Sequence, residues 1–344
     1  RYVFEESVSA EALQAGRLCA APVASHLIWH LTKGKTFATD PTLAQRMLLL
    51  DIRTQSWSPA LCRAFGVSET CLPAILPSRA DYGTYEYRGV KIPITVCTGD
   101  QQASVAFMQL AKGQACINYG TGAFLLYNAG TEKPVLLPGM LTSLSASDAD
   151  GKSAFLLEGP VNAAGSAVQW LRAQGIAFDP AETDELCRQA KQPVWFLPAL
   201  GGLGAPYWDF TFSPVAAGLS PRTRRPDWVA GVLQGVAFLL ADIVAYLQQN
   251  GCAVSAPVKV SGGLARSSWL VQKQADLLQV PVHLLHDVQS TVLGAARLAA
   301  GADSAAWPLP QTDAFAPLLS PAQARQLYDR WRKFVAWCKQ FPAS

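Results

Sequence analysis

The order of apolar and glycine-containing stretches after residue 112 limits the fold of this chain more than any other feature. Two apolar stretches, 115–119 and 123–129, are joined by Gly120-Thr121-Gly122, a connection typical of a hairpin. The stretches LTSLSAS and SAFLLEG flank the turn 148–152 in the same way. This region of the chain is therefore expected to begin with two antiparallel hairpins.

Beyond residue 160 the pattern alternates between helices and strands. The expected helices span about 160–174, 228–250, 264–278 and a segment from Thr291, and strands are expected at 194–200, 258–263 and 280–285. An amphipathic closing helix is expected after Ser320, with Pro321 in its first turn. Antiparallel strands followed by this alternation are typical of an α/β fold, in which helices cover the faces of a mixed sheet.

The first third of the chain is expected to be mainly helical. Asp40-Pro41 and Ser58-Pro59 each have the form of an N-cap followed by a proline at the first helical position. The stretch 90–96 predicts a strand, and 101–111 predicts the helix after it. Asp100 stands between the two, where an acidic residue can cap the helix, contact a ligand or act as a catalytic base. The local pattern leaves all three roles open.

The composition indicates a globular chain of two domains. Its 344 residues are enough for two cores. Half of the residues are hydrophobic, 15% are charged and the net charge is +3, which argues against nucleic acid as a partner. The stretch 228–247 is long enough to span a bilayer, but it contains Gln234 and Asp242 and ends near Gly251. The pattern favours a buried core helix and no membrane partner.

The cysteines and histidines show no metal-binding spacing. The eight cysteines are scattered without a CxxC pair, and most lie in apolar surroundings. This favours free core thiols in a reducing, cytoplasmic environment over a disulfide framework or a zinc site. His26 and His30 have helical spacing, but no carboxylate or cysteine is near them in sequence. These two histidines are interpreted as packing or surface residues.

Three glycine-containing turns stand at the ends of expected strands. YGTGAF (119–124) could place backbone amides and the Thr121 hydroxyl against phosphate oxygens, or it could be an ordinary hairpin turn. VSGGLARSSW (260–269) could hold a ligand at a helix N-terminus, although it has neither the GxGxxG nor the GxxxxGK pattern. GGLGAPYWD (201–209) is either a ligand-contacting loop or a loop that packs its own aromatic side chains. Each turn alone is a weak signal.

In this order the turns belong to a longer run of motifs. The run is TGDQQAS, YGTGAFLLYN, LEGPVNAAGSAVQWLR, FLPALGGLGAPYWD, SGGLARSSWLVQKQADLL and STVLGAA, and LIWHLTKGKTFATDPTLAQRM precedes it. Together these motifs resemble the FGGY family of carbohydrate kinases over nearly all of residues 16–300. The resemblance implies a ribonuclease-H-like (actin-like ATPase) two-domain kinase fold. Residues 1–112 would be the later part of an incomplete first, polyol-binding domain, and 113–344 would be the nucleotide-binding domain.

The resemblance also implies roles for single residues. It implies ATP-dependent phosphorylation of a small polyol, glycerol first, because other branches of the family carry a different loop in place of GLGAPYWD. Asp100 would be the general base, which accepts the hydroxyl proton as the bond to phosphorus forms. Gln101 and Phe124 would contact the polyol. The implied nucleotide-binding residues are Thr121, Gly165, Gln169, Gly263 and Ser267.

The implied cofactors are ATP and Mg²⁺. The family's first phosphate-binding hairpin, with the Asp that helps to hold Mg²⁺, is expected upstream of Arg1. None of the site residues above is therefore expected to be a metal ligand, and residues 1–344 alone are expected to be inactive. The resemblance leaves a homo-oligomer open.

Two alternatives to a glycerol-phosphorylating enzyme remain. One is an FGGY kinase of another sugar or alditol, and the other is a non-catalytic relative that binds nucleotide or polyol. Retention of Asp100 argues against the second, because a binding module needs no base. Several positions depart from the family pattern: Ser267 replaces a common Asn, Ser261 an Asp, Gln289 a Glu, and 85–93 lacks the GGTR pattern associated with sugar-bisphosphate inhibition. These departures concern the substrate and regulation more than the kinase assignment.

Overall fold

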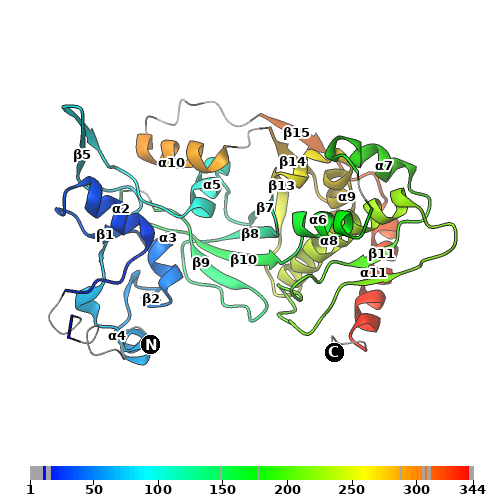
Figure 1. The fold of residues 1–344 in the computed structure, drawn as a ribbon, viewed down its shortest axis with the longest axis horizontal. Coiled ribbons are helices and arrows are strands. Elements are labelled where there is room, and N and C mark those ends of the chain that lie inside the picture. Colours follow the sequence, from blue (N-terminus) through cyan, green and yellow to red (C-terminus); the bar gives the residue numbers. More distant parts are fainter. Residues whose placement is uncertain are drawn as a thin grey trace.

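A seven-stranded mixed sheet forms the centre of the structure (Figure 1). This computed structural model describes residues 11–12, 17–147, 149–176, 178–286, 289–301, 303, 307 and 311–340. In spatial order the strands are β15 (Thr312–Phe315), β14 (Val282–Leu285), β13 (Ser255–Gly262), β7 (Gln114–Tyr119), β8 (Ala123–Gly130), β10 (Phe155–Val161) and β9 (Leu141–Leu144). β13 is parallel to both of its neighbours, and the other pairs are antiparallel. The two expected hairpins and the mixed sheet are confirmed, although Asp148 of the second turn lies outside the described residues.

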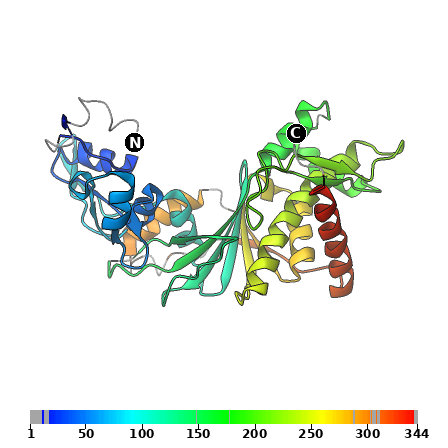
Figure 2. The same cartoon turned by 90° about the horizontal axis from the view of Figure 1, so that it is seen from below.

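Side chains alternate between the two faces of this sheet, and helices cover both faces. Ile117, Leu125 and Leu157 belong to the larger apolar core. Leu126 and Leu156 belong to a second core on the opposite face. Figure 2 shows the long helices on one side of the sheet and α10, in orange, on the other. Along each central strand of this sheet, successive side chains therefore point to opposite faces, toward one or the other of the two cores.

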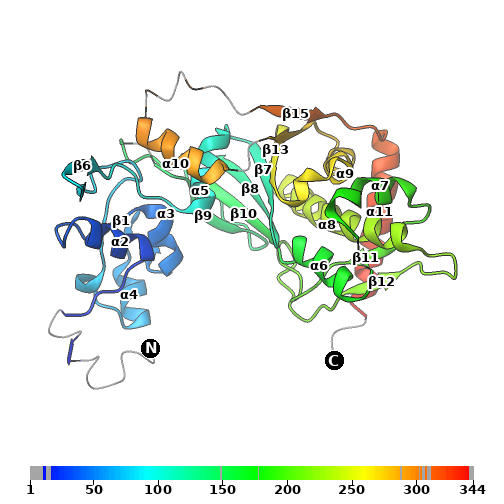
Figure 3. The ribbon, with the colours of Figure 1, turned by 45° about the horizontal axis from the view of Figure 1, so that its top comes forward.

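The two helical layers come from different parts of the chain. The larger core is closed by α6 (Gly165–Ala173), α8 (Arg225–Gln249), α9 (Ser268–Leu278) and α11 (Pro321–Cys338). The smaller core is closed by α5 (Asp100–Met108) and α10 (Ser290–Ala300), which also pack against each other (Figure 3). The helix that starts with Asp100 therefore lies on the sheet, although it precedes every strand of the sheet in sequence.

The helix α8 is long and apolar enough to cross a membrane by length and composition, but 83% of its apolar window is buried inside the molecule. Two glycines bring it close to β11 (Trp195–Leu197) and the residue before it. A Cβ at Gly231 would lie 2.4 Å from the carbonyl oxygen of Val194, and one at Gly235 would lie 2.3 Å from that of Phe196. The expected core helix is confirmed.

Asp242 on α8 is a buried carboxylate that joins three segments. It accepts hydrogen bonds from the Tyr207 hydroxyl (2.9 Å), the Tyr328 hydroxyl (2.7 Å) and the Trp331 indole nitrogen (2.8 Å). Tyr207 comes from the loop 201–209, so this loop packs its own aromatic residue toward the core. Burial raises the pKa of Asp242 to about 6, although its three hydrogen-bond donors favour the charged form.

The raised pKa makes stability depend on pH. Between pH 4 and 6 folded Asp242 keeps a proton that the unfolded chain releases, so the free energy of unfolding falls as the pH rises through this window. Asp242→Asn removes this titration. We expect the melting temperature of the wild type to fall by about 2–4 °C relative to the variant between pH 4 and 6.5. If the melting temperatures of the two proteins changed with pH in the same way, the raised pKa of Asp242 would be contradicted.

The described part of the chain before α5 consists of short elements. They are α2 (Val23–Leu31), β1 (Ala38–Thr39), α3 (Pro41–Ala44), η2 (Gln45–Met47), β2 (Leu50–Asp51), β3 (Ser56–Trp57), α4 (Pro59–Phe65), η3 (Glu69–Cys71), β4 (Ala74–Ile75), β5 (Thr84–Tyr87) and β6 (Val90–Pro93). Asp40 and Ser58 cap α3 and α4, as expected. The expectation of a mainly helical segment is wrong, because strands of two to four residues are too short to show an alternating pattern.

Several expected boundaries also differ. The strand before Asp100 ends at Pro93, where its hairpin with β5 ends, and 94–99 continue as an irregular extended segment. The helix expected from about 160 begins only at Gly165, because β10 continues to Val161. The remaining elements are η4 (Pro180–Glu182), α7 (Thr183–Gln189), β11, β12 (Val215–Ala217) and η5 (Leu264–Arg266). Among the described α-helices and strands after residue 112, α7, β12 and β15 were not predicted from the sequence.

Candidate active site

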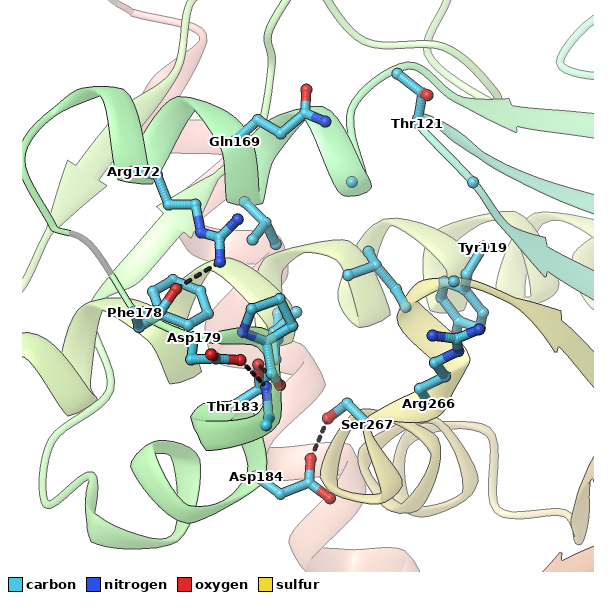
Figure 4. A pocket seen from close by; sticks show the side chains of 18 residues that line it. Tyr119, Thr121, Gln169, Arg172, Phe178, Asp179, Thr183, Asp184, Arg266 and Ser267 are labelled. Carbon is cyan, nitrogen blue, oxygen red and sulfur yellow. Dashed lines mark hydrogen bonds between the residues drawn. The ribbon is translucent and has the colours of Figure 1, made fainter.

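A cavity of about 730 Å³ lies beside the β7–β8 hairpin (Figure 4). Its walls come from this hairpin turn, α6, the segment 178–184 and the turn after β13. All five residues expected at a nucleotide line it: Thr121, Gly165, Gln169, Gly263 and Ser267. Three separate sequence motifs therefore converge on one cavity.

The hairpin turn is held against the start of α6. The Gly165 amide donates to the carbonyl of Gly120 (3.0 Å), and the Ser166 amide donates to that of Thr121 (2.9 Å). A Cβ at Gly165 would lie 2.7 Å from the Gly120 oxygen, which is closer than a side chain can approach. Glycine is therefore required here for the hairpin and the helix to meet.

The two glycines after β13 have different roles. Gly262 has φ +100°, and a Cβ there would lie 2.4 Å from the carbonyl oxygen of Tyr119. Gly263 has a right-handed helical conformation with φ −63°, and a Cβ there would meet no atom within 4 Å. Gly262 is required by the backbone, whereas Gly263 leaves a stretch of the cavity wall without a side chain.

Ser267 lines the cavity, but its hydroxyl already has protein partners. It is the N-cap of α9 and accepts from the Leu270 amide (3.2 Å), while it donates to Asp184 of α7 (2.5 Å). Asp184 also accepts from the Ser268 amide (3.0 Å). Ser267 therefore helps to join α7 to the N-terminus of α9, in addition to lining the cavity.

Charged and aromatic residues around the cavity were missed by the sequence analysis. They are Arg172, Phe178, Asp179, Asp184 and Arg266. The Arg172 guanidinium donates to the carbonyl of Phe178 and lies 5.2 Å from the centre of its ring. The segment 178–184 forms no glycine turn and no apolar repeat, so only the folded chain identifies it as a wall of the cavity.

Asp100 does not line this cavity and does not cap α5. It is the first residue of the helix, Gly99 is the N-cap, and the cap makes no side-chain hydrogen bond. The Asp100 side chain is exposed and accepts a hydrogen bond from the Gln101 amide (2.7 Å). The capping interpretation of Asp100 is wrong, and its carboxylate remains accessible from solvent.

Next to Gln101, an ion pair joins the first part of the chain to the sheet. Arg46 contacts both carboxylate oxygens of Glu158 at 2.6 and 3.0 Å, and its guanidinium lies 3.5 Å from the Gln101 side-chain oxygen. Glu158 is 3% exposed and also accepts from the Ser143 hydroxyl (2.6 Å). Its negative charge is therefore compensated where it is buried.

Phe124 lies on the face of the sheet that α5 covers. On β8 it is two residues from Leu126, so both side chains point to the same face. It pairs with Pro160, two residues from Glu158 on β10, and it is 37% exposed. The structure thus places Phe124 on the face covered by the helix of Asp100 and Gln101, outside the cavity lining. The β7–β8 hairpin joins the two regions, because Thr121 precedes Phe124 by three residues.

Within the described ranges, no group of three or more His, Cys, Asp or Glu side chains could hold a metal ion. Mg²⁺ in phosphoryl-transfer enzymes is commonly bound through one or two carboxylates and the substrate phosphates. The described residues are thus compatible with Mg²⁺ that binds together with a nucleotide and is held mainly by its phosphates, but they do not form a complete set of metal ligands by themselves.

The mixed sheet with helices on both faces and the cavity at its hairpin agree with the actin-like, ribonuclease-H-like fold that the sequence motifs imply. The models described as FGGY family of carbohydrate kinases, N-terminal and C-terminal domain, match residues 8–106 and 115–302. The chain belongs to this family, and its class is therefore that of a phosphotransferase that acts on an alcohol group.

Relatives and solved structures agree with this assignment. The chain is 38% identical to a glycerol kinase of Thermus brockianus over 96% of its own length and 68% of the relative's. It is 36% identical to one of Methylobacterium nodulans, with 93% and 67% covered. The structure of Plasmodium falciparum glycerol kinase with ADP superposes with a TM-score of 0.91 at 28% identity, over 98% of this chain and 70% of that one.

A xylulose kinase from Lactobacillus acidophilus superposes with a TM-score of 0.76 at 22% identity, over 91% of this chain and 66% of that one. At this identity the likeness shows the fold alone. The chain spans about two thirds of the length of the proteins that it matches.

Proposed function

We propose that this chain belongs to an enzyme that transfers the terminal phosphoryl group of ATP to glycerol. The observation that carries the proposal is the convergence of Thr121, Gly165, Gln169 and Gly263 on one cavity, with Phe124 following on the same hairpin. The names of the relatives support glycerol as the acceptor. The cavity would hold the nucleotide, and the face near Asp100 would hold the polyol.

In the proposed reaction Asp100 acts as the general base. A hydroxyl oxygen of glycerol forms a bond to the γ-phosphorus of ATP while the bond from this phosphorus to the bridging oxygen of ADP breaks. The hydroxyl proton passes to the Asp100 carboxylate, which is exposed to solvent in the structure. Gln101 and Phe124 orient the polyol. The products are glycerol 3-phosphate, ADP and a proton.

The hairpin would hold the phosphate end of the nucleotide. The Thr121 turn is fixed against α6 by backbone hydrogen bonds, so a ligand that binds there meets a preorganised backbone. Mg²⁺, when bound with ATP, supplies charge neutralisation on the phosphates. Gly263 would let the adenosine approach the turn after β13.

The substrate is tested by steady-state kinetics. We assay the full protein with ATP and Mg²⁺ against glycerol, xylulose, gluconate and erythritol, and we follow ADP formation and the phosphorylated product. We expect the highest kcat/KM for glycerol. A higher value for a sugar or sugar acid would favour another branch of the family. ATP binding without turnover of any acceptor would favour a non-catalytic relative.

The variant Ser267→Ala tests whether the Ser267 hydroxyl stabilises the fold or binds the nucleotide. Because its hydroxyl caps α9 and bonds Asp184, we expect Ser267→Ala to lower the free energy of unfolding by about 1 kcal/mol. The dissociation constant of ATP should change less than about threefold, equivalent to less than ~0.7 kcal/mol. Chemical denaturation and calorimetry measure the two quantities. A larger loss of ATP affinity with unchanged stability would show that the hydroxyl acts on the nucleotide.

We further propose a cytoplasmic location. All eight cysteines are free thiols, and seven are buried in the structure, which supports a reducing compartment. Cell fractionation with an antibody against the protein tests this location.

A further inference from the structure

We propose that Thr42 is a positioning residue that sets the backbone ahead of Asp100 through a buried hydrogen-bond network. The inference rests on the proposed role of Asp100. The network consists of Asp40, Thr42, Ser78 and Ser147, whose side chains are all 0% exposed. No sequence motif that we used pointed to it as a unit.

Thr42 contacts Asp40 on one side and the Asp100 segment on the other. Its hydroxyl lies 2.8 and 2.9 Å from the two carboxylate oxygens of Asp40, to which it donates. The same oxygen accepts the Gly99 amide at 2.8 Å. Gly99 is the N-cap of α5, and Asp100 is the next residue. Thr42 therefore fixes the backbone amide of Gly99, the residue directly before the proposed base Asp100.

The side chains of Gln102 and Thr42 lie directly beside Gly99. A Cβ at Gly99 would lie 2.5 Å from the Gln102 side-chain oxygen and 3.5 Å from the Thr42 hydroxyl. A displacement of about 1 Å at a reacting group can cost ~100-fold in rate. The contact is thus well placed to affect turnover without touching a substrate.

Asp40 is held in turn by groups of the first part of the chain, and one of them, Ser78, contacts a residue that follows β9. It accepts from the Ser78 hydroxyl (2.6 Å) and the Leu43 amide (3.1 Å). Ser78 and Ser147 bond each other reciprocally: the Ser78 amide donates to the Ser147 hydroxyl (2.8 Å), and the Ser147 amide donates to the Ser78 hydroxyl (3.0 Å). Ser147 follows β9 of the large sheet. The network therefore links the loop of Asp100 to the sheet that carries the cavity.

The chain offers a matched control at a neighbouring position. Thr39 is also 0% exposed, but its hydroxyl makes no hydrogen bond in the structure. Thr→Val removes a hydroxyl at nearly constant shape at both positions. At Thr42 the substitution leaves the Gly99 amide without its acceptor, whereas at Thr39 no hydrogen bond is lost.

The experiment measures kcat, the KM for ATP and the melting temperature of Thr42→Val, Thr42→Ser and Thr39→Val in the full protein. We expect Thr42→Val to lower kcat by about 10–100-fold with a KM for ATP within about twofold of the wild type. Thr42→Ser keeps the hydroxyl and should retain kcat within about threefold, and Thr39→Val should behave as the wild type. A Thr42→Val enzyme that is folded and fully active would overturn the inference, as would an equal loss in Thr42→Ser.

A double-mutant cycle with Asp100→Asn separates this inference from the proposed function. If Thr42 acts through Asp100, adding Thr42→Val to Asp100→Asn lowers kcat by less than about threefold further. Fully additive losses would mean that Thr42 acts elsewhere, and they would reject the positioning role. An active Asp100→Asn enzyme would reject the base itself. An inactive Asp100→Asn with a fully active Thr42→Val would reject the positioning role alone.

Discussion

Asp100→Asn is expected to lower kcat by about 10²–10⁴-fold, because the amide keeps the size of the side chain but cannot accept the substrate proton. The dissociation constant of ATP should stay the same, since Asp100 does not line the cavity. Folding should also be unaffected, because the side chain is exposed and is not the N-cap of α5. Rapid-quench or coupled assays with glycerol, together with calorimetry for ATP, measure the two effects.

Asp329→Asn provides the matched control for this substitution. Asp329 is an exposed carboxylate on α11, remote in sequence from both parts of the candidate site. The control variant should keep full turnover. Near-normal turnover of Asp100→Asn would remove Asp100 as the base and leave its position at the start of α5 without a catalytic role.

Gly263→Val is expected to weaken ATP binding tenfold or more, equivalent to at least about 1.4 kcal/mol. The reason is space: the backbone at Gly263 suits any residue, no atom lies within 4 Å of a Cβ there, and the position lines the cavity. The Gly263→Val protein should therefore fold without backbone strain, and the valine side chain would occupy the part of the cavity that the nucleotide needs. Glycerol affinity without nucleotide should remain, and calorimetry with each ligand separately tests both statements.

Thermal melts of a variant at the neighbouring glycine separate backbone strain from loss of space for the nucleotide. Gly262→Ala combines φ +100° with a contact of 2.4 Å to the Tyr119 carbonyl, so its melting temperature should fall. Gly263→Val should keep the wild-type melting temperature. Equal loss of both ligands by a stably folded Gly263→Val, or loss of neither, would mean that the nucleotide binds elsewhere.

The cavity was predictable because its backbone requirements leave traces in the sequence. Gly165 and Gly262 are needed where two backbones meet, so the motifs that contain them carry a glycine at these positions. The two hairpins and α8 could also be predicted from the sequence, because their apolar stretches are long and bounded by turn residues. The domain division at residue 112 remains a proposal, although residues 107–114 separate the two ranges that match the family.

The remaining parts depend on contacts between distant residues. Asp184 reaches Ser267 across 83 positions, and Ser78 reaches Ser147 across 69. Neither pair has a local pattern, so α7 and the network around Asp40 emerge only from the folded chain. Asp100 illustrates a different limit: strand, acid and helix occur in the expected order, yet the strand ends at Pro93 and Gly99 is the cap. Hairpin pairing with β5 decides that boundary.

The contact between α8 and α11 has a consequence for biosynthesis. Trp331 is 0% exposed, and its ring stacks on Phe238 with centroids 4.7 Å apart. On the ribosome, α8 emerges about 90 residues earlier than α11, at a translation rate of about 5–20 residues per second. For several seconds the nascent chain therefore exposes the apolar surface of α8 around Phe238, together with Asp242. A chaperone that binds apolar surface can therefore act on α8 during that interval.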